Sequence, residues 1–516
     1  MRKTLTIFLL FASLLTGCLP IAPAVIPATS TETSVPPTQT IATTPWWNDS
    51  VFYEIFVRSF NDSNGDGIGD FNGITQKLNY LQNLGVTGLW LMPINPSPSY
   101  HGYDVTDYYN ANPQYGTMDD FKNLLREAHK RGIKIIIDLV INHTSDQHPW
   151  FKSAKKDPNS PYRDWYIWSL TDPKYVGPWG ERVWHPSPTG YYYGIFESSM
   201  PDLNYNNPAV TQEIERVIKF WLTDVGIDGF RMDAIKHLVE EGVKQQNTES
   251  THLWLKNNFY PTYKAANPNA LAVGELSGDS INIIARYVQG KQFDLAFNFP
   301  LAISFLDAAS TGGPFLAIDT LNLSEKVLPD RQYATFLTNH DQNRVMSVLN
   351  GDANKAKVAA ALLLTSPGTP FIYYGEEIGQ QGKKPDEDIR LPMQWSADAN
   401  AGFTTGRPWR APFANYQTRP ANRRHSSARY SQHWTLCQFT FQRSGSRTRA
   451  CQFIRYIAQR LFVDARQKFP ACWNASTLNA FRRRFKRVIY DQCRWRFLQF
   501  QATLRNSTLC DQHLST

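Results

Sequence analysis

The chain alternates short apolar, strand-like runs with helix-like stretches across residues 46–380. In helix-like stretches such as 119–132 and 210–226, apolar residues recur every three to four positions. This alternation is typical of a parallel sheet with crossover helices, and eight such units predict an α/β fold of the (β/α)8 TIM-barrel class. The eight strand-like runs are 51–60, 85–93, 133–142, 227–234, 271–276, 293–299, 333–341 and 369–377.

Residues 144–205 interrupt this pattern after the third strand-like run and are rich in Trp, Tyr, Pro and Asp. The segment is too long for an ordinary loop of a compact domain. We therefore expect a catalytic barrel domain over residues 46–418 that carries a small subdomain at 144–205.

Polar and charged side chains stand near the carboxyl ends of the predicted strands, which is the face where barrel active sites are built. A single Asp after a strand more often caps a helix, but several acids beside an Arg and two His favour an active site. One ionised and one protonated carboxyl group suit glycoside cleavage, and no cluster with zinc-ligand spacing is present. The residues are Asp138, Asn142, His143, Arg231, Asp233, Glu275, His340, Asp341, Glu376 and Glu377.

Five short segments resemble the signature segments of the α-amylase family of glycoside hydrolases, in order along the chain. The resemblance covers roughly residues 46–410, and the full set is far more specific than any one segment. The segments are DLVINH (138–143), MPDLN (200–204), GFRMDAIKH (229–237), GELS (274–277) and TNHDQNR (338–344).

The resemblance implies a role for each matching residue. Asp233 would be the nucleophile, Glu275 the general acid and base, and Asp341 the acid that binds hydroxyls of the distorted sugar. Because family members retain the anomeric configuration, the carboxyl groups of Asp233 and Glu275 should lie about 5–5.5 Å apart. Arg231 would keep Asp233 ionised, and the other substrate-binding residues would be Tyr103, Asp104, His143, Lys236, His237, His340 and Arg344.

The loop NDSNGDGIGDFNG (61–73) concentrates acids and glycines after the first strand-like run. From Asp62 onward, its first nine positions follow those of a calcium-binding loop of EF-hand type, but Gly73 replaces the usual Glu at position 12. A turn stabilised by Asx and Gly residues is the alternative interpretation. The resemblance favours a structural Ca²⁺ site whose ligands are Asp62, Asn64, Asp66, the Ile68 carbonyl and Asp70.

The resemblance also indicates a second calcium site and a substrate class. Asn142, Asp202 and the carbonyl of His237 would hold the second Ca²⁺. Ala234 after the nucleophile and the Lys236–His237 pair resemble enzymes that cleave α-1,4-glucans, such as starch and maltooligosaccharides, with transglycosylation as a side activity. The alternatives are an α-1,6/α-1,4 oligosaccharide glucosidase, a non-catalytic glucan-binding protein, or an inactive gene product.

The first 18 residues combine Arg2 and Lys3 with a short apolar stretch and predict an export signal. Leu15-Thr16-Gly17-Cys18 resembles a bacterial lipobox, in which Cys18 would carry the lipid; an ordinary signal peptide is the alternative. Residues 19–45 are rich in Pro and Thr and predict an extended linker. We therefore expect an exported, monomeric protein anchored in a membrane.

The segment 419–516 differs in composition from the rest of the chain and lacks the eighth barrel helix and β-sandwich that the resemblance implies. It holds 17 Arg and 2 Lys against 3 Asp, a net charge of +16, so residues 1–418 carry −8 of the total of +8. Five of the six cysteines also lie there. A shifted reading frame near residues 417–420, a basic nucleic-acid- or envelope-binding appendage containing FRRRFKR (481–487), and a cysteine-stapled module are the interpretations. The acidic main body leads us to expect no nucleic-acid partner.

Overall fold

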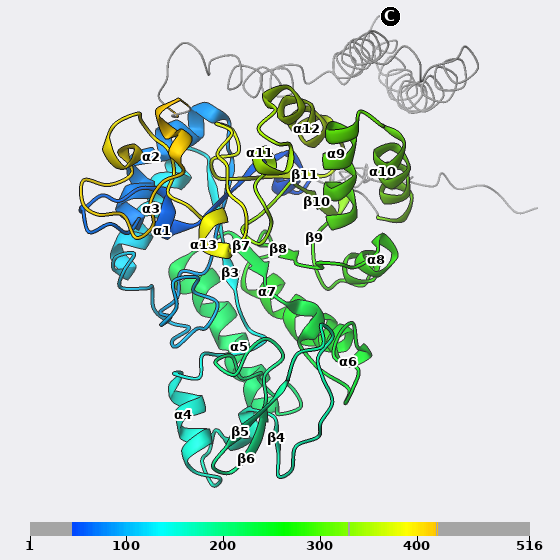
Figure 1. The fold of residues 1–516 in the computed structure, drawn as a ribbon. Helices are drawn as coiled ribbons and strands as arrows, with labels where there is room; N and C mark the ends of the chain where they lie inside the picture. The colour runs from blue at the N-terminus through cyan, green and yellow to red at the C-terminus, as the bar shows by residue number, and fades with distance from the viewer. Residues whose placement is uncertain (1–43, 329–330, 419–420, 422–516) are drawn as a thin grey trace, which may run out of the picture. The chain divides into compact units, whose positions relative to one another are not determined.

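The computed structural model describes residues 44–328, 331–418 and 421, and it shows a closed barrel of eight parallel strands (Figure 1). β1 pairs with both β2 and β11, so the sheet has no free edge. The strands are β1 (Phe52–Ile55), β2 (Gly88–Leu91), β3 (Lys134–Leu139), β7 (Gly229–Met232), β8 (Leu271–Gly274), β9 (Leu295–Phe297), β10 (Tyr333–Thr335) and β11 (Thr369–Tyr373). The predicted TIM-barrel class is confirmed.

Helices surround the barrel, and their sequences explain where they begin and which face they bury. In α3, the side chain of Thr117 accepts from the Asp120 N–H, and the side chain of Asp120 accepts from the Thr117 N–H. Phe121 and Leu124 lie on the buried face of this helix. The helices that follow barrel strands are α1 (Val57–Phe60), α2 (Phe71–Leu84), α3 (Met118–Lys130), α5 (Pro208–Lys219), α6 (Glu249–Trp254), α7 (Tyr260–Ala266), α8 (Ile281–Gln289), α9 (Phe299–Thr311), α10 (Phe315–Val327), α11 (Val345–Val348), α12 (Ala353–Thr365) and α13 (Asp386–Ile389).

Large apolar side chains fill the barrel interior. Phe52 of β1 and Phe371 of β11 stack with ring centroids 4.4 Å apart, and Trp90 of β2 lies 5.3 Å from Phe297 of β9. All four are buried. This packing fills the barrel core and leaves the opening at the carboxyl ends of the strands, where active sites of this fold are built.

Residues 144–205 fold into the predicted subdomain after β3, which lies at the lower end of Figure 1. It contains α4 (Pro149–Lys156) and a three-stranded antiparallel sheet of β4 (Trp168–Ser169), β5 (Trp184–Ser187) and β6 (Gly190–Tyr193). Its own small core consists of Val183, Trp184, Tyr193 and Ile195.

Beyond β11, the described chain contains only short helices, namely α13, Ala399–Gly402 and Ala414–Gln417. The predictions for the signal segment, Cys18, the linker and the tail concern residues that lie outside the described ones, except Thr44, Pro45 and Ala421. They stay predictions, as does the monomeric state. Among the described residues, no helix has the length and apolar character needed to span a bilayer.

Candidate active site

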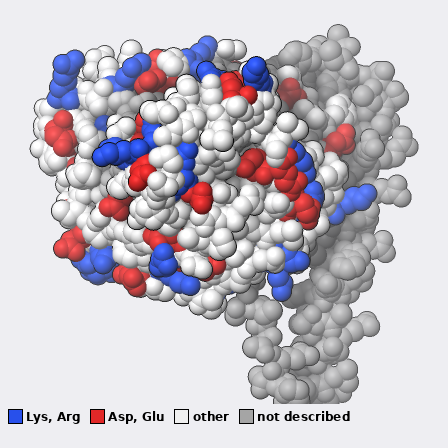
Figure 2. Space-filling model, turned by 90° about the horizontal axis from the view of Figure 1, so that it is seen from below, with Lys and Arg blue, Asp and Glu red and all other residues white. Residues whose placement is uncertain are grey.

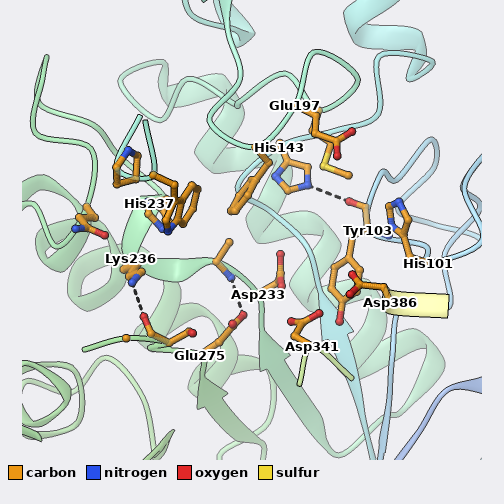
Figure 3. A pocket seen from close by; sticks show the side chains of 18 of the residues that line it. His101, Tyr103, His143, Glu197, Asp233, Lys236, His237, Glu275, Asp341 and Asp386 are labelled. Atoms are coloured by element: carbon orange, nitrogen blue, oxygen red, sulfur yellow. Dashed lines mark hydrogen bonds between the residues drawn. The ribbon is translucent and has the colours of Figure 1, made fainter. Parts of the chain in front are cut away.

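A cavity of about 1030 Å³ opens where the barrel strands end, between the loops after β2, β7, β8, β10 and β11 and the inserted subdomain (Figure 3). The three predicted catalytic acids, Asp233, Glu275 and Asp341, all line it. On the face of the molecule drawn in Figure 2, acidic and basic side chains are interspersed among uncharged ones.

Arg231 is the centre of the acid cluster. Its side chain is fully buried on β7 and donates to the Asp138 carboxylate at 2.8 Å, to Asp233 at 2.7 Å, and to Glu275. Because Asp233 and Glu275 accept from different terminal nitrogens of one guanidinium, a single planar group fixes the positions of both carboxyl groups. Arg suits this position because its rigid fork can bind several carboxylates at once.

The environment raises the pKa of both members of this acid pair. Burial, together with the Asp138 charge, raises the pKa of Asp233 to about 6 against the opposing effect of Arg231. Burial also raises the pKa of Glu275, as do the charges of Asp233 and Asp341. A raised pKa is what a general acid requires, since it must hold its proton near neutral pH.

Asp341 is held in the opposite state by two cations. Its carboxylate accepts from Arg390 at 2.9 Å and lies 3.2 Å from Nε2 of His340. Burial alone would raise the pKa of Asp341, but the charges of His340 and Arg390 outweigh it and lower that pKa. Burial would likewise lower the pKa of His340, but Asp341 and Glu54 raise it to about 10. Asp341 is therefore an ionised acceptor beside a charged imidazole.

Tyr103 connects the acid cluster around Arg231 with the His340–Asp341 pair. Its hydroxyl donates to Asp138 at 3.0 Å and lies 2.7 Å from Nε2 of His340, whose ring is stacked on the tyrosine ring. His143 lines the cavity next to it and bonds through Nε2 to the Tyr103 carbonyl at 3.0 Å. Burial lowers the pKa of His143 to about 4, so this ring is neutral.

Lys236 and His237 line the cavity beyond Asp233, on the turn that follows β7. Nζ of Lys236 donates to the Ser277 carbonyl, and His237 bonds through Nδ1 to the Gln245 carbonyl at 2.9 Å. Between Asp233 and Lys236, Ala234 lines the cavity with a left-handed backbone, φ 49°. The small side chain leaves space beside the nucleophile.

Four predicted substrate-binding residues do not line the cavity: Arg231 and His340, which contact the catalytic acids as described above, and Asp104 and Arg344. Asp104 is buried and accepts from Ser97 at 2.6 Å. Arg344 is buried and donates to the carbonyls of Ile389 and Tyr374, so it supports the loop that carries Asp341. The structure places these side chains outside the cavity lining, and their direct contact with substrate stays a prediction.

The sequence analysis also missed residues that complete the site. Glu54 bonds to His340 at 2.6 Å, and Arg390 fixes Asp341. Trp179 and Phe196 of the inserted subdomain line the opening. Glu54 lies inside the apolar strand β1, and the signal that could have revealed it is a charged residue in an otherwise apolar run. The loops that carry Arg390, Trp179 and Phe196 have no motif.

This arrangement can cleave a glycosidic bond in two steps. An oxygen of Asp233 would bond to the anomeric carbon as the carbon–oxygen bond to the leaving sugar breaks, and Glu275 would give its proton to the leaving oxygen. In the second step Glu275 takes a proton from water, whose oxygen displaces Asp233 from the anomeric carbon. Two displacements at one carbon retain its configuration. The predicted carboxyl separation stays a prediction.

In the loop 61–73, the carboxylates accept hydrogen bonds from backbone N–H groups and so stabilise a series of turns. Asp62 accepts from the N–H groups of Asn64, Gly65 and Gly67, and Asp70 caps α2 through the Gly73 N–H. Oxygen donors of this kind suit Ca²⁺, and each carboxylate oxygen retains further lone pairs. The described residues contain no group of three or more His, Cys, Asp or Glu side chains that could hold a metal. A site here would depend also on the Asn64 amide and Ile68 carbonyl.

The second predicted calcium site brings Asn142 and Asp202 together. Nδ2 of Asn142 donates to Asp202 at 3.1 Å, while Oδ1 of Asn142 is buried without a hydrogen-bond partner. Burial raises the pKa of Asp202 well above its ordinary value. An unpartnered oxygen beside a buried carboxyl group fits a cation, which would lower that pKa again.

Comparisons with known proteins agree with this geometry. The family model described as the α-amylase catalytic domain matches residues 54–443, which extends past the boundary at 418 that we expected. The chain is 47% identical over 365 residues to Alpha-amylase 3 of Dictyoglomus thermophilum, covering 70% of each chain. It is 38% identical to the trehalose synthase/amylase TreS of Mycolicibacterium smegmatis, over 71% of this chain and 70% of that one. It is 35% identical to an oligo-1,6-glucosidase of Parageobacillus thermoglucosidasius, over 72% and 79%.

Among solved structures, an α-amylase from H. orenii is similar with a TM-score of 0.70 and 45% identity, over 77% of this chain and 82% of that one. The family match spans well over half of the chain, and its residues include the whole acid cluster around Arg231. The chain therefore belongs to the α-amylase family of glycoside hydrolases.

Proposed function

We propose that this protein hydrolyses α-1,4-glucosidic bonds in starch and maltooligosaccharides with retention of configuration, as an α-amylase does. The observation that carries the chemistry is the guanidinium of Arg231 between Asp233 and Glu275, which pairs a nucleophile with an acid of raised pKa. The linkage is supported by Ala234 in the cavity wall and by the relatives named α-amylase at 47% and 45% identity.

Relatives named trehalose synthase and oligo-1,6-glucosidase support a second candidate, action on trehalose or on α-1,6-linked oligosaccharides. The full-length chain should be incubated with maltoheptaose, isomaltose and trehalose, and the products and their anomeric form followed by NMR. Short maltooligosaccharides that appear first as α-anomers support the proposed function. Turnover of isomaltose or trehalose without turnover of maltoheptaose would replace it by the second candidate.

We also propose that Ca²⁺ stabilises the loop 61–73, with Asp62, Asn64, Asp66, the Ile68 carbonyl and Asp70 as ligands. EDTA should lower the melting temperature by several degrees, because a ligand that binds only the folded state stabilises it. In Asp66→Asn the effect of EDTA should be small or absent. Asp119→Asn, an exposed Asp in the first turn of α3, is the matched control and should melt like the unchanged chain. Equal melting with and without EDTA would remove the calcium proposal.

A further inference from the structure

We propose that Trp179, backed by Phe196, is the binding platform for the glucan units that leave with the scissile oxygen. The inference deepens the proposed function, on which it rests, by assigning the inserted subdomain a role in choosing long α-glucan chains. Both rings line the cavity, although neither belongs to the acid cluster.

A tight hairpin presents Trp179 at the opening of the cavity. Val176 and Arg182 form an antiparallel bridge, and the Gly180 N–H donates to the Gly177 carbonyl at 3.0 Å. Pro178 occupies the first central position of this turn, where its fixed φ is suited. The backbone N–H of Trp179 also donates to the Glu181 carboxylate at 3.0 Å. The turn therefore holds the indole in place before any ligand arrives.

The indole is 61% exposed although it is large and apolar. It stacks on Phe196 with centroids 5.7 Å apart and planes at 30°, and it lies 5.3 Å from His237. Phe196 in turn lies 5.3 Å from His143. These rings form a continuous row from His143, which is bonded to the Tyr103 carbonyl, to the rim of the cavity. Aromatic faces bind the apolar C–H faces of sugar rings while leaving the hydroxyl groups hydrated.

The position of Glu275 decides which part of the substrate meets this row. In Figure 3, Lys236, His237 and Glu275 lie on one side of Asp233, and Tyr103, His101 and Asp386 lie on the other. The acid must reach the leaving oxygen, so the leaving sugar lies on the side of Glu275. Since Trp179 contacts His237, its ring faces the units beyond the scissile bond.

The test compares a substrate that has a sugar leaving group with one that does not. In Trp179→Ala, kcat/KM for maltoheptaose should fall about tenfold, mainly through KM. For α-glucosyl fluoride, kcat/KM should stay within about twofold, because the fluoride leaving group has no sugar ring that could stack on Trp179. Trp179→Phe should restore most of the loss. Leu170→Ala is the matched control, because Leu170 is 89% exposed on the same subdomain and does not line the cavity. Equal losses on both substrates, or no loss on maltoheptaose, would overturn the inference.

A binding measurement separates this inference from the proposed function. Maltoheptaose is titrated by calorimetry into the full chain carrying Asp233→Asn, with and without Trp179→Ala. About tenfold weaker binding in the double variant supports the platform, even if the unchanged chain shows no turnover and the proposed hydrolysis fails. Equal affinity, or no binding to Asp233→Asn at all, refutes the platform.

Discussion

Asp233→Asn is expected to lower kcat on maltoheptaose by at least about 10⁴-fold, as the loss of a nucleophile does in other hydrolases. An amide has nearly the shape of the carboxylate and can still accept from Arg231, but it cannot form the bond to the anomeric carbon. The rate of product release, measured over several hours, checks the prediction. The variant should retain the fold, because burial opposes the charge that the substitution removes.

Asp224→Asn is the matched control for this variant. Asp224 is exposed at the end of the segment Phe220–Val225 and does not line the cavity. It should leave both kcat and the melting temperature unchanged. If Asp233→Asn kept more than a few per cent of the activity while Asp224→Asn was normal, Asp233 would not be the nucleophile.

Arg231→Met is expected to lower the free energy of unfolding at pH 7 by about 3–5 kcal/mol and to abolish activity, because it leaves buried carboxylates without their cation. Asp138, Asp233 and Glu275 would then repel one another in a buried site. Their pKa values would rise further, so the loss of stability should be largest above these pKa values and shrink as the pH falls through them. Urea unfolding at pH 5 and pH 8 measures this difference.

Arg231→Lys separates charge from geometry. The ammonium keeps the positive charge but cannot donate to three carboxylates in the same fork, so stability should recover more than activity. In the unchanged chain, activity should fall below about pH 6 as Asp233 takes a proton, and in Arg231→Lys this acidic limb should move to higher pH. Arg216→Met removes an exposed cation that pairs with Glu213, and it should change stability by less than about 1 kcal/mol. An equal effect at both sites would contradict the central role of Arg231.

The sequence predicted the barrel well because the signal is repeated eight times. The individual strands are shorter than the apolar runs, however. The run 51–60 contains β1 and then α1, and 333–341 contains only the three residues of β10 before the loop with His340 and Asp341. Apolar residues are buried in both conformations, so periodicity over a few residues cannot place the boundary between them.

The sequence predicted those site residues that have a reactive side chain and also follow a strand. Asp233, Glu275 and Asp341 each follow a strand, and a closed barrel brings all strand ends to one opening. Asp104 and Arg344 stand beside motif residues in the sequence, but Asp104 bonds within its own loop, to Ser97, and Arg344 bonds to Ile389 of the loop after β11. Sequence order alone does not show which of these groups a side chain meets in the folded chain.

The sequence by itself determined the barrel class, the inserted subdomain and the three acids, because strand periodicity and side-chain chemistry are local properties that accumulate along the chain. Only the tertiary structure decided the pKa shifts of the catalytic acids and which residues of the inserted subdomain line the cavity. Glu54 and His340 are far apart in sequence, as are Arg390 and Asp138, yet their charges meet around the catalytic acids. Trp179 reaches the same cavity from the inserted subdomain. Electrostatic and stacking interactions depend on distances in space, and folding alone sets those distances.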